Sequence, residues 1–228
     1  FLEGELLSMG MWSVGLGALG AAVAGILLAN TDLLLTKPAQ ASLDYLEDTD
    51  LKTLGEDEVT FKAKTLWDRT GAVIMAVRRP GSVLCLQEAA ELSSLKPQLE
   101  ELGVPLYAVV KENLGSEIRD FRPHFKGEIF LDEKRRFYGP QQRRMGLTGL
   151  IRLGVLHSFL RAWKKGFVGN VAGEGFVLGG VFVIGAGKQG ILLEHREKEF
   201  GDKVNITSVL EAAKNVQAQK LPCFQGCF

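Results

Sequence analysis

Ser82 and Cys85 have the residue types and the spacing that could support redox chemistry. They lie in the stretch RRPGSVLCLQEAAEL, which runs from Arg78 to Leu92. Their separation is that of a C-x-x-C motif, with serine in place of the first cysteine. A serine hydroxyl cannot form a disulfide and is not oxidised as a thiol is. The stretch is therefore a redox motif with one position changed, a site with a single cysteine, or only a turn between a strand and a helix.

The position of Cys85 favours a redox role. The stretch follows an apolar run and enters a helical pattern, so Cys85 is expected near the amino end of a helix. Free backbone N–H groups and positive partial charge at that end favour a thiolate, and Arg78 and Arg79 would add to the effect. A lowered thiol pKa is what peroxide or disulfide chemistry requires. We predict Ser82 and Cys85 as catalytic positions and Arg78 and Arg79 as thiolate-stabilising residues; the alternative for Cys85 is a small buried side chain.

Three apolar runs predict the strands that position this stretch. Residues 72–77, 104–110 and 128–132 are typical of buried strands in a parallel sheet. Between the first two, apolar residues recur at intervals of three and four from residue 83 to residue 102, which predicts an amphipathic helix. Pro97 is expected to kink or divide this helix. After the second strand, SEIRDFRPHF predicts a short helix for which Ser116 is a candidate cap.

The carboxyl-terminal half predicts a helix, a hairpin and a second helix. Residues 145–167 are helix-like, VLGGVFVIG and GILLEHRE flank the turn AGKQG, and NITSVLEAAKNV predicts a closing helix capped by Asn205 or Thr207. Strands that alternate with helices imply right-handed crossovers. The predicted fold is α/β and thioredoxin-like, with a mixed, mainly parallel central sheet flanked by helices and with an N-terminal hydrophobic helix.

Residues 9–29 contain no charged side chain and are about long enough to span a bilayer. A membrane anchor, a secretory signal and a buried helix all remain open, although Glu3 and Glu5 stand where a signal would carry basic residues. We divide the chain into an N-terminal hydrophobic helix and candidate anchor (1–36), a connector with a helix (37–58), a thioredoxin-like redox domain (59–217) and a flexible tail (218–228).

Composition and charge limit the partners. The 228 residues have a formal net charge of +0, so no overall field favours nucleic acid, and no nucleic-acid partner is expected. Three cysteines, an odd number in a chain of this length, do not suggest a secreted disulfide framework. A reducing, cytoplasmic location is expected, with membrane association through residues 9–29, and secretion is the alternative. No cluster with metal-ligand spacing is present, so no metal and no bound cofactor are expected.

Several long motifs are specific enough to compare with known families: AVIMAVRRPG, LCLQEAAELSSLK, LGVPLYAVVKE, GEIFLDEKRRFYGP and GEGFVLGGVFVIGAGKQGILLEHREKEFGDKVN. They closely resemble the peroxiredoxin-like family of redox-regulatory proteins in the thioredoxin-like superfamily. Members are described as antioxidant, and they carry C-x-x-C, or selenocysteine-x-x-C in some vertebrate selenoproteins, after R-R-P-G. Cys85 matches the second position of that motif. Ser82 occupies the first position, and there the chain departs from the family.

The resemblance implies an oxidoreductase or peroxidase that reduces a peroxide or a disulfide, with glutathione or thioredoxin as the external reductant. Activity is expected to be impaired if Ser82 replaces the attacking residue. One alternative is a lipid or prostaglandin endoperoxide reductase, as in a related branch, and another is a non-catalytic membrane-associated signalling module. Cys223 and Cys227 lie in the tail, as free thiols or with one of them in a resolving role. The oligomeric state is left open by the sequence.

Overall fold

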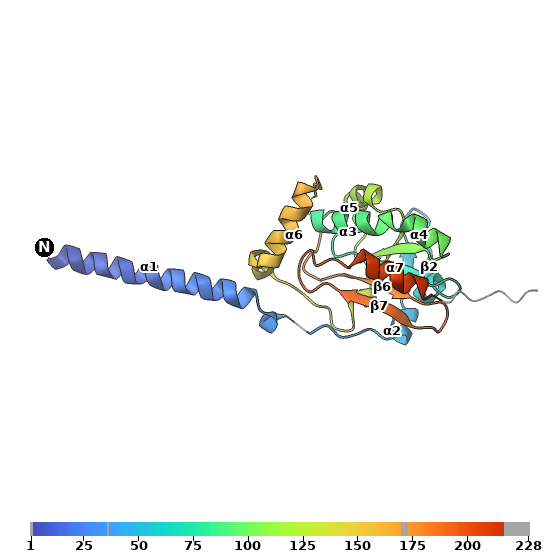
Figure 1. Ribbon diagram of the computed structural model, residues 1–228, viewed down its shortest axis with the longest axis horizontal. Coiled ribbons are helices and arrows are strands. Elements are labelled where there is room, and N and C mark those ends of the chain that lie inside the picture. The colour runs from blue at the N-terminus through green and yellow to red at the C-terminus, as the bar shows by residue number, and fades with distance from the viewer. Residues whose placement is uncertain (1, 36, 170–172, 217–228) are drawn as a thin grey trace, which may run out of the picture.

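A mixed β-sheet forms the centre of the domain (Figure 1). The computed structural model describes residues 2–35, 37–169 and 173–216, and within these the sheet has seven strands in the order β2-β1-β5-β4-β3-β6-β7. Neighbours β3–β4 and β4–β5 are parallel, and the outer pairs are antiparallel. The strands are β1 (Asp50–Thr53), β2 (Thr60–Lys62), β3 (Ala72–Ala76), β4 (Leu106–Val110), β5 (Glu128–Leu131), β6 (Gly180–Ile184) and β7 (Ile191–Arg196).

Strand β3 lies inside the sheet and contributes to a core on each face, because successive side chains point to opposite sides of a strand. Val73 and Met75 join the apolar cluster formed with α3, α4, α5 and α7. Ile74 joins the cluster on the other face, with Trp67 and Phe182. The helices are α1 (Leu2–Ala29), α2 (Leu43–Glu47), α3 (Val83–Ser94), α4 (Lys96–Glu101), α5 (Gly115–Phe121), α6 (Leu153–Lys164) and α7 (Ile206–Lys214). The thioredoxin-like α/β fold expected from the sequence is confirmed, but the expectation of a mainly parallel sheet is wrong, because four of the six strand pairs in the described residues are antiparallel.

Local signals in the sequence account for several helix ends. Pro97 divides the expected long helix into α3 and α4, and Gly103, with φ +70°, follows the end of α4. The Asn205 side chain accepts hydrogen bonds from the N–H groups at the start of α7, as expected of a cap. The expected Ser116 cap is wrong, because α5 begins at Gly115 and Leu114 occupies the cap position.

Two parts of the chain differ from the sequence expectation. Strand β1 lies in the segment expected to be a connector, yet it pairs with β5; it is only four residues long and only Leu51 is buried, so no apolar run marks it. The helix expected over residues 145–167 is divided at Arg152, which has an extended backbone between the 3₁₀ helix η5 (Leu147–Ile151) and α6. The Arg152 side chain is buried and forms an ion pair with Glu199 at 2.8 Å, which fixes this break.

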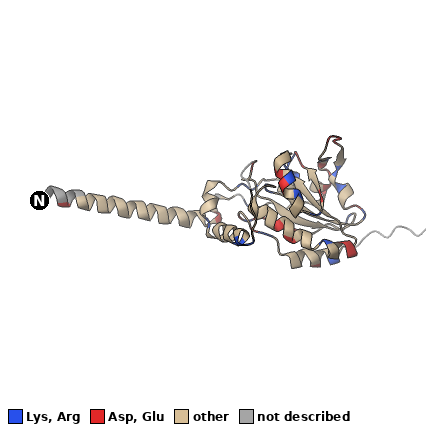
Figure 2. Cartoon of the chain, turned by 90° about the horizontal axis from the view of Figure 1, so that it is seen from above, with Lys and Arg blue, Asp and Glu red and all other residues tan. Residues whose placement is uncertain are grey.

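Helix α1 projects from the domain, and the colouring of Figure 2 shows almost no charged residue along it. Its segment Ser8–Ala29 is long and apolar enough to cross a membrane, by length and composition. The carboxyl-terminal end of α1 meets the amino-terminal end of α6. There the Asn30 Oδ1 accepts a hydrogen bond of 2.9 Å from the Leu153 N–H, and Arg152 donates to Asp32 at 3.1 Å. Residues 217–228, which contain Cys223, Cys227 and the expected tail, lie outside the described residues.

Candidate functional site

The stretch with Ser82 and Cys85 forms the junction between β3 and α3. A turn closed by the Ser82 N–H and the Arg79 carbonyl, 3.0 Å apart, brings the chain from the strand to the helix. Ser82 is the residue immediately before α3, but its side chain does not cap the helix. Its hydroxyl oxygen instead accepts a hydrogen bond of 3.0 Å from Arg78 Nη2. The side-chain atom at position 82 therefore faces a cation.

Arg78 is buried and links four parts of the site. Besides Ser82, its guanidinium donates to the Gly175 carbonyl at 3.1 Å and lies over the Phe200 ring, 4.8 Å from the centroid. Its Nε atom is 3.8 Å from Glu197 Oε2. A buried guanidinium is held in place most firmly when its partners lie in several directions, as they do here. The charge at position 78 is thus fixed beside the atom at position 82.

A cavity of about 580 Å³ opens at Ser82. Its polar end is formed by Ser82, Arg78 and Arg79, and most of its wall is apolar. Volume and lining are those of a small-molecule site, which is typically apolar with a few polar groups in fixed positions. The remaining lining residues come from the start of α3, from η5 and α6, and from the segments before β6 and after β7: Val83, Leu84, Leu147, Leu150, Val155, Phe159, Gly169, Gly173, Gly175, Phe176 and Phe200.

The segment before β6 packs over the strand–helix junction. A Cβ added at Gly169 would lie 2.5 Å from the Gly81 carbonyl oxygen and from the Val83 nitrogen, so the backbones touch and no side chain fits. Farther along, Glu174 forms an ion pair with buried Lys111 at the end of β4. Gly169, Gly173, Gly175 and Phe176 therefore form one wall of the cavity.

Cys85 lies in the first turn of α3 and points into the core instead of the cavity. Its side chain is 2% exposed and belongs to the cluster formed by β3 and the helices. Burial raises the pKa of the Cys85 thiol, and the positive charge of Arg78 opposes this only in part. The expected thiolate-favouring environment therefore does not prevail at Cys85, because desolvation outweighs the helix terminus and the arginine.

Arg79 also lines the cavity, and its surroundings differ from those of Arg78. Burial lowers the pKa of the Arg79 guanidinium, the neighbouring charge of Arg78 adds to this decrease, and Glu117 opposes it. Of the four residues singled out by the sequence, three line the cavity: Ser82, Arg78 and Arg79. The fourth, Cys85, lies beneath it.

Two buried carboxyl groups behind the site were not identified from the sequence. Burial raises the pKa of Glu88 to about 8, with Glu197 contributing through charge repulsion. Burial also raises the pKa of Glu197, and the charge of Arg78 lowers it. Glu88 follows Cys85 by three residues and Glu197 follows β7. Their positions in the sequence therefore do not indicate that the two carboxyl groups lie close enough to repel each other. An acidic residue on the otherwise apolar face of a helix was the one available signal, at Glu88.

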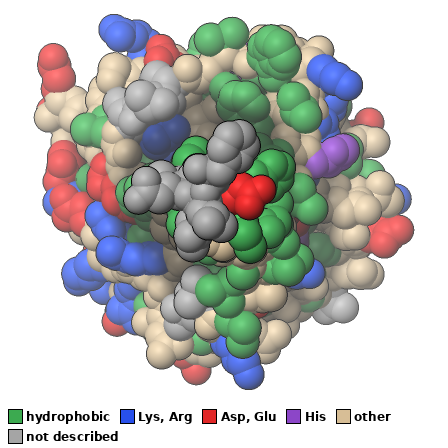
Figure 3. All heavy atoms as spheres, turned by 90° about the vertical axis from the view of Figure 1, so that its left-hand side faces the viewer, with side chains coloured by type: hydrophobic (Ala, Val, Ile, Leu, Met, Phe, Trp, Pro, Cys, Tyr) green, Lys and Arg blue, Asp and Glu red, His purple; other side chains and the backbone are tan. Residues whose placement is uncertain are grey.

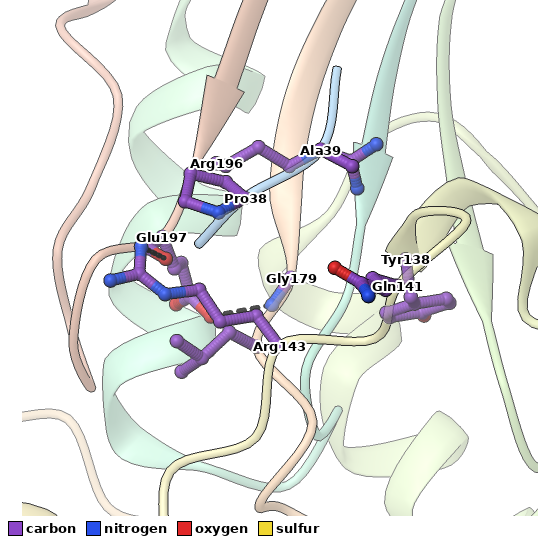
Figure 4. A pocket seen from close by; sticks show the side chains of 9 residues that line it. Pro38, Ala39, Tyr138, Gln141, Arg143, Gly179, Arg196 and Glu197 are labelled. Carbon is purple, nitrogen blue, oxygen red and sulfur yellow. Dashed lines mark hydrogen bonds between the residues drawn. The ribbon is translucent and has the colours of Figure 1, made fainter. Parts of the chain in front are cut away.

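Glu197 is held by the backbone at the entry to β6 (Figure 4). Its Oε2 accepts a hydrogen bond of 2.7 Å from the Gly179 N–H. The small pocket drawn there, between Pro38, Arg143 and Glu197, has a volume of about 10 Å³. That is at the lower limit for a single water molecule, so the pocket is too small for a substrate. The larger cavity at Ser82 is the candidate active site.

Within the described residues, no group of three or more His, Cys, Asp or Glu side chains is arranged to hold a metal ion. The groups at the site that can take part in chemistry are the side chain at position 82, the thiol of Cys85 and the charge of Arg78.

A strand–helix junction with an S-x-x-C pair, in a sheet of this topology, defines the chain as a thioredoxin-like protein of the peroxiredoxin type. Residues 91–199 match the family described as AhpC/TSA antioxidant enzyme, a match that begins after Cys85. The chain belongs to the peroxiredoxin-like 2A family. It is 71% identical to Peroxiredoxin-like 2A of Danio rerio over 93% of this chain and 100% of that one. It is 68% identical to Peroxiredoxin-like 2A of Homo sapiens over 95% of each chain.

A solved structure shows the same fold at low sequence identity. It is a Burkholderia cenocepacia protein provisionally assigned as a thioredoxin reductase, with a TM-score of 0.51 and 16% identity over 77% of this chain and 98% of that one. At that identity the likeness establishes the fold alone. The redox role is supported by the family, whose model describes antioxidant enzymes.

Proposed function

We propose that the site is that of a peroxide-reducing oxidoreductase in which a sulfur or selenium atom at position 82 reacts and Cys85 supplies the second sulfur, so that the residue at position 82 decides whether the protein turns over. The observation that carries this proposal is the different placement of the two side chains. Ser82 is buried but lines the cavity beside the Arg78 guanidinium, whereas Cys85 is buried in the core and does not line the cavity. A substrate in the cavity therefore meets the side chain at position 82 first.

The reaction requires a thiolate or a selenolate at position 82. That atom attacks the terminal oxygen of the peroxide, the O–O bond breaks, and the departing alkoxide takes up a proton and leaves as an alcohol. Position 82 becomes a sulfenic or selenenic acid. The Cys85 sulfur then forms a bond to it and water is released; two molecules of glutathione, or one dithiol of thioredoxin, reduce the new bond. Arg78 would stabilise the attacking anion.

Serine at position 82 cannot carry out this step. Cys85 is buried and its pKa is raised, so its thiolate is scarce at neutral pH and peroxide reaches it slowly. The proposal is therefore that the cavity retains peroxide binding, while the residue at position 82 determines whether the protein turns over.

The test is the Ser82→Cys variant, with Cys223 and Cys227 replaced by serine in every protein compared. Consumption of hydrogen peroxide and of cumene hydroperoxide is measured with glutathione and with thioredoxin plus its reductase. Ser82→Cys is expected to turn over and to form a disulfide between positions 82 and 85. Adding Cys85→Ser should stop at the sulfenic acid when peroxide is added without a thiol reductant, and Ser82→Ala should remain inactive. If Ser82→Cys is as inactive as the parent with both reductants, the chain is a non-catalytic module.

We further propose that α1 anchors the protein in a membrane, with the domain in the reducing cytoplasm. Support comes from the exposed apolar segment Ser8–Ala29, for which the domain provides no covering surface. Flotation of the full chain with phosphatidylcholine vesicles, before and after an alkaline carbonate wash, tests the anchor. Removal of α1 during expression in cells, detected by mass spectrometry, would show a processed secretory signal and refute the anchor.

A further inference from the structure

Helix α6 has apolar side chains on two faces, and only one of them is used by the fold. Val155, Ser158 and Ala162 are buried against the domain. On the outer face, side chains spaced by three and four residues form an exposed apolar stripe, which consists of Leu153, Leu156, Leu160 and Trp163. Trp163 is 66% exposed. An exposed apolar patch of this kind marks a surface that contacts something other than water.

The stripe lies on the side of the domain from which α1 emerges. The bonds of Asn30 to Leu153 and of Asp32 to Arg152 hold the end of α1 at the start of α6. In Figure 1, α6 runs across the direction of α1 and forms the edge of the domain nearest to it. Figure 3 looks along α1 onto this edge and shows hydrophobic side chains gathered around it. If α1 crosses a bilayer, α6 lies flat against the bilayer surface.

We propose that the outer face of α6, together with η5, docks on a lipid bilayer and that an acyl chain of a lipid in that bilayer enters the cavity at Ser82. The docking surface resembles an interfacial amphipathic helix, with Trp163 at headgroup depth. Exposed Lys164 follows Trp163, and exposed Arg144 precedes η5, where both can meet lipid phosphates. We assign a bilayer to this surface because α1, which is long enough to cross a membrane, is bonded to the same edge of the domain.

The cavity is continuous with this docking surface. Leu147, Leu150 and Phe159 line the cavity, and each is also more than half exposed on the same edge. An apolar chain can therefore pass from the bilayer between η5 and α6 to the polar end formed by Ser82 and Arg78 without crossing water. A cavity of about 580 Å³ accommodates part of an acyl chain and not a whole phospholipid. The peroxide class is thus a hydroperoxide on a lipid acyl chain, which rests on the function proposed above.

The docking surface is tested with Trp163 fluorescence in the full chain carrying Trp12→Phe. The protein is reconstituted in vesicles of phosphatidylcholine and phosphatidylserine, with and without bromine on the acyl chains, since bromine quenches nearby tryptophan. Trp67 is buried in the far core cluster and serves as the unquenched reference. We expect brominated lipid to remove most of the Trp163 emission, and further replacement by Trp163→Phe to abolish the difference between the two vesicles.

A matched control places the probe elsewhere. Val59 is 56% exposed beside β2. Strand β2 lies at the opposite end of the sheet from β6 and β7, next to which the cavity is formed. Tryptophan at position 59, in the background of Trp12→Phe and Trp163→Phe, should be equally bright in both vesicles. Leu156→Lys with Leu160→Lys should keep flotation through α1 and lose the quenching of Trp163. Equal Trp163 emission in both vesicles, with flotation intact, overturns the docking surface and leaves the anchor and the peroxide chemistry standing.

Entry of the chain is tested with a phosphatidylcholine that carries a photoreactive diazirine on one acyl chain. After irradiation, adducts on Val155 or Phe200, which line the cavity and are buried, are expected alongside adducts on the outer stripe, as found by peptide mass spectrometry. Leu150→Trp keeps the surface apolar while filling the mouth of the cavity, and it should remove the adducts on Val155 and Phe200 alone. Adducts confined to the stripe, with none on cavity residues, would overturn lipid entry. Neither readout depends on turnover, so each is independent of the Ser82→Cys test.

Discussion

Replacing Glu88 by glutamine should make the protein more stable at alkaline pH. The Glu88 carboxyl is buried, and its Oε1 accepts a hydrogen bond of 3.0 Å from the Val204 N–H. Burial raises its pKa from 4.5 to about 8. A glutamine has the same shape, keeps the acceptor for Val204 and carries no charge. The variant therefore removes the cost of ionising a buried carboxyl and leaves the hydrogen bond in place.

The sign and size of the effect follow from linkage. The folded protein binds the Glu88 proton more tightly than the unfolded chain does, so stability falls as the pH rises from 4.5 to about 8 and is constant above that range. Each unit of pKa difference is about 1.4 kcal/mol, so the limit is about 5 kcal/mol. Water drawn in by the ionised carboxylate reduces this value, and we expect Glu88→Gln to gain about 2–5 kcal/mol at alkaline pH.

The assay is urea unfolding of the parent and of Glu88→Gln in detergent micelles, from about pH 5 to about pH 9. The two proteins should be close in stability at the acidic end and should separate as the pH rises. Glu101→Gln, at an exposed position on α4, is the matched control and should follow the parent throughout. Parallel curves for the parent and Glu88→Gln across the whole range would refute the argument that Glu88 is held neutral by burial.

Three further substitutions test packing around the site. The buried Tyr138 hydroxyl donates to the carbonyls of Val77 and Val109, so Tyr138→Phe should cost about 1–2 kcal/mol in urea unfolding; an unchanged midpoint would contradict this bond. A Cβ at Gly179 would lie 2.1 Å from the Ala76 carbonyl oxygen, so Gly179→Ala should lower the melting temperature by more than a surface Gly→Ala change at Gly55, and equal losses would count against it. Asn205→Ala should cost about 1 kcal/mol through loss of the α7 cap, with Asn205→Asp recovering most of it; no loss on Asn205→Ala would show that the cap does not contribute.

The central strands and the helices between them were predictable because their signals are local. β3 and β4 are continuous apolar runs, and Pro97 and Gly103 mark a helix division and a helix end through their own backbone restrictions. β1 gives no such signal, because it is short and only one of its residues is buried. The break at Arg152 depends on an ion pair with Glu199, 47 positions further along the chain, which no local pattern contains.

The candidate site was likewise predictable only where its signals are local in the sequence. The junction after β3 and the residues within it can be located from spacing and from the family motif. The cavity wall formed by η5, α6 and the segment before β6 cannot, because these parts meet position 82 only through the tertiary fold. The raised pKa of Cys85 could not be predicted either. A helix terminus and two arginines are visible in the sequence, whereas the burial that outweighs them is a property of the packed core.

The charges around position 82 bear on the proposed dependence of turnover on the atom at that position. In the interior, Arg78 Nε lies 3.8 Å from Glu197 Oε2. Glu88 adds a second carboxyl group, and because burial raises its pKa to about 8, this group is mostly protonated at lower pH. Among the described residues, Glu197 is the carboxyl group that forms an ion pair with Arg78. A thiolate from Ser82→Cys would compete with Glu197 for the same guanidinium, and each would raise the pKa of the other. The thiolate is therefore most favoured when Glu197 is protonated. The protonation of Glu88 and Glu197 thus influences the reactivity of a cysteine at position 82.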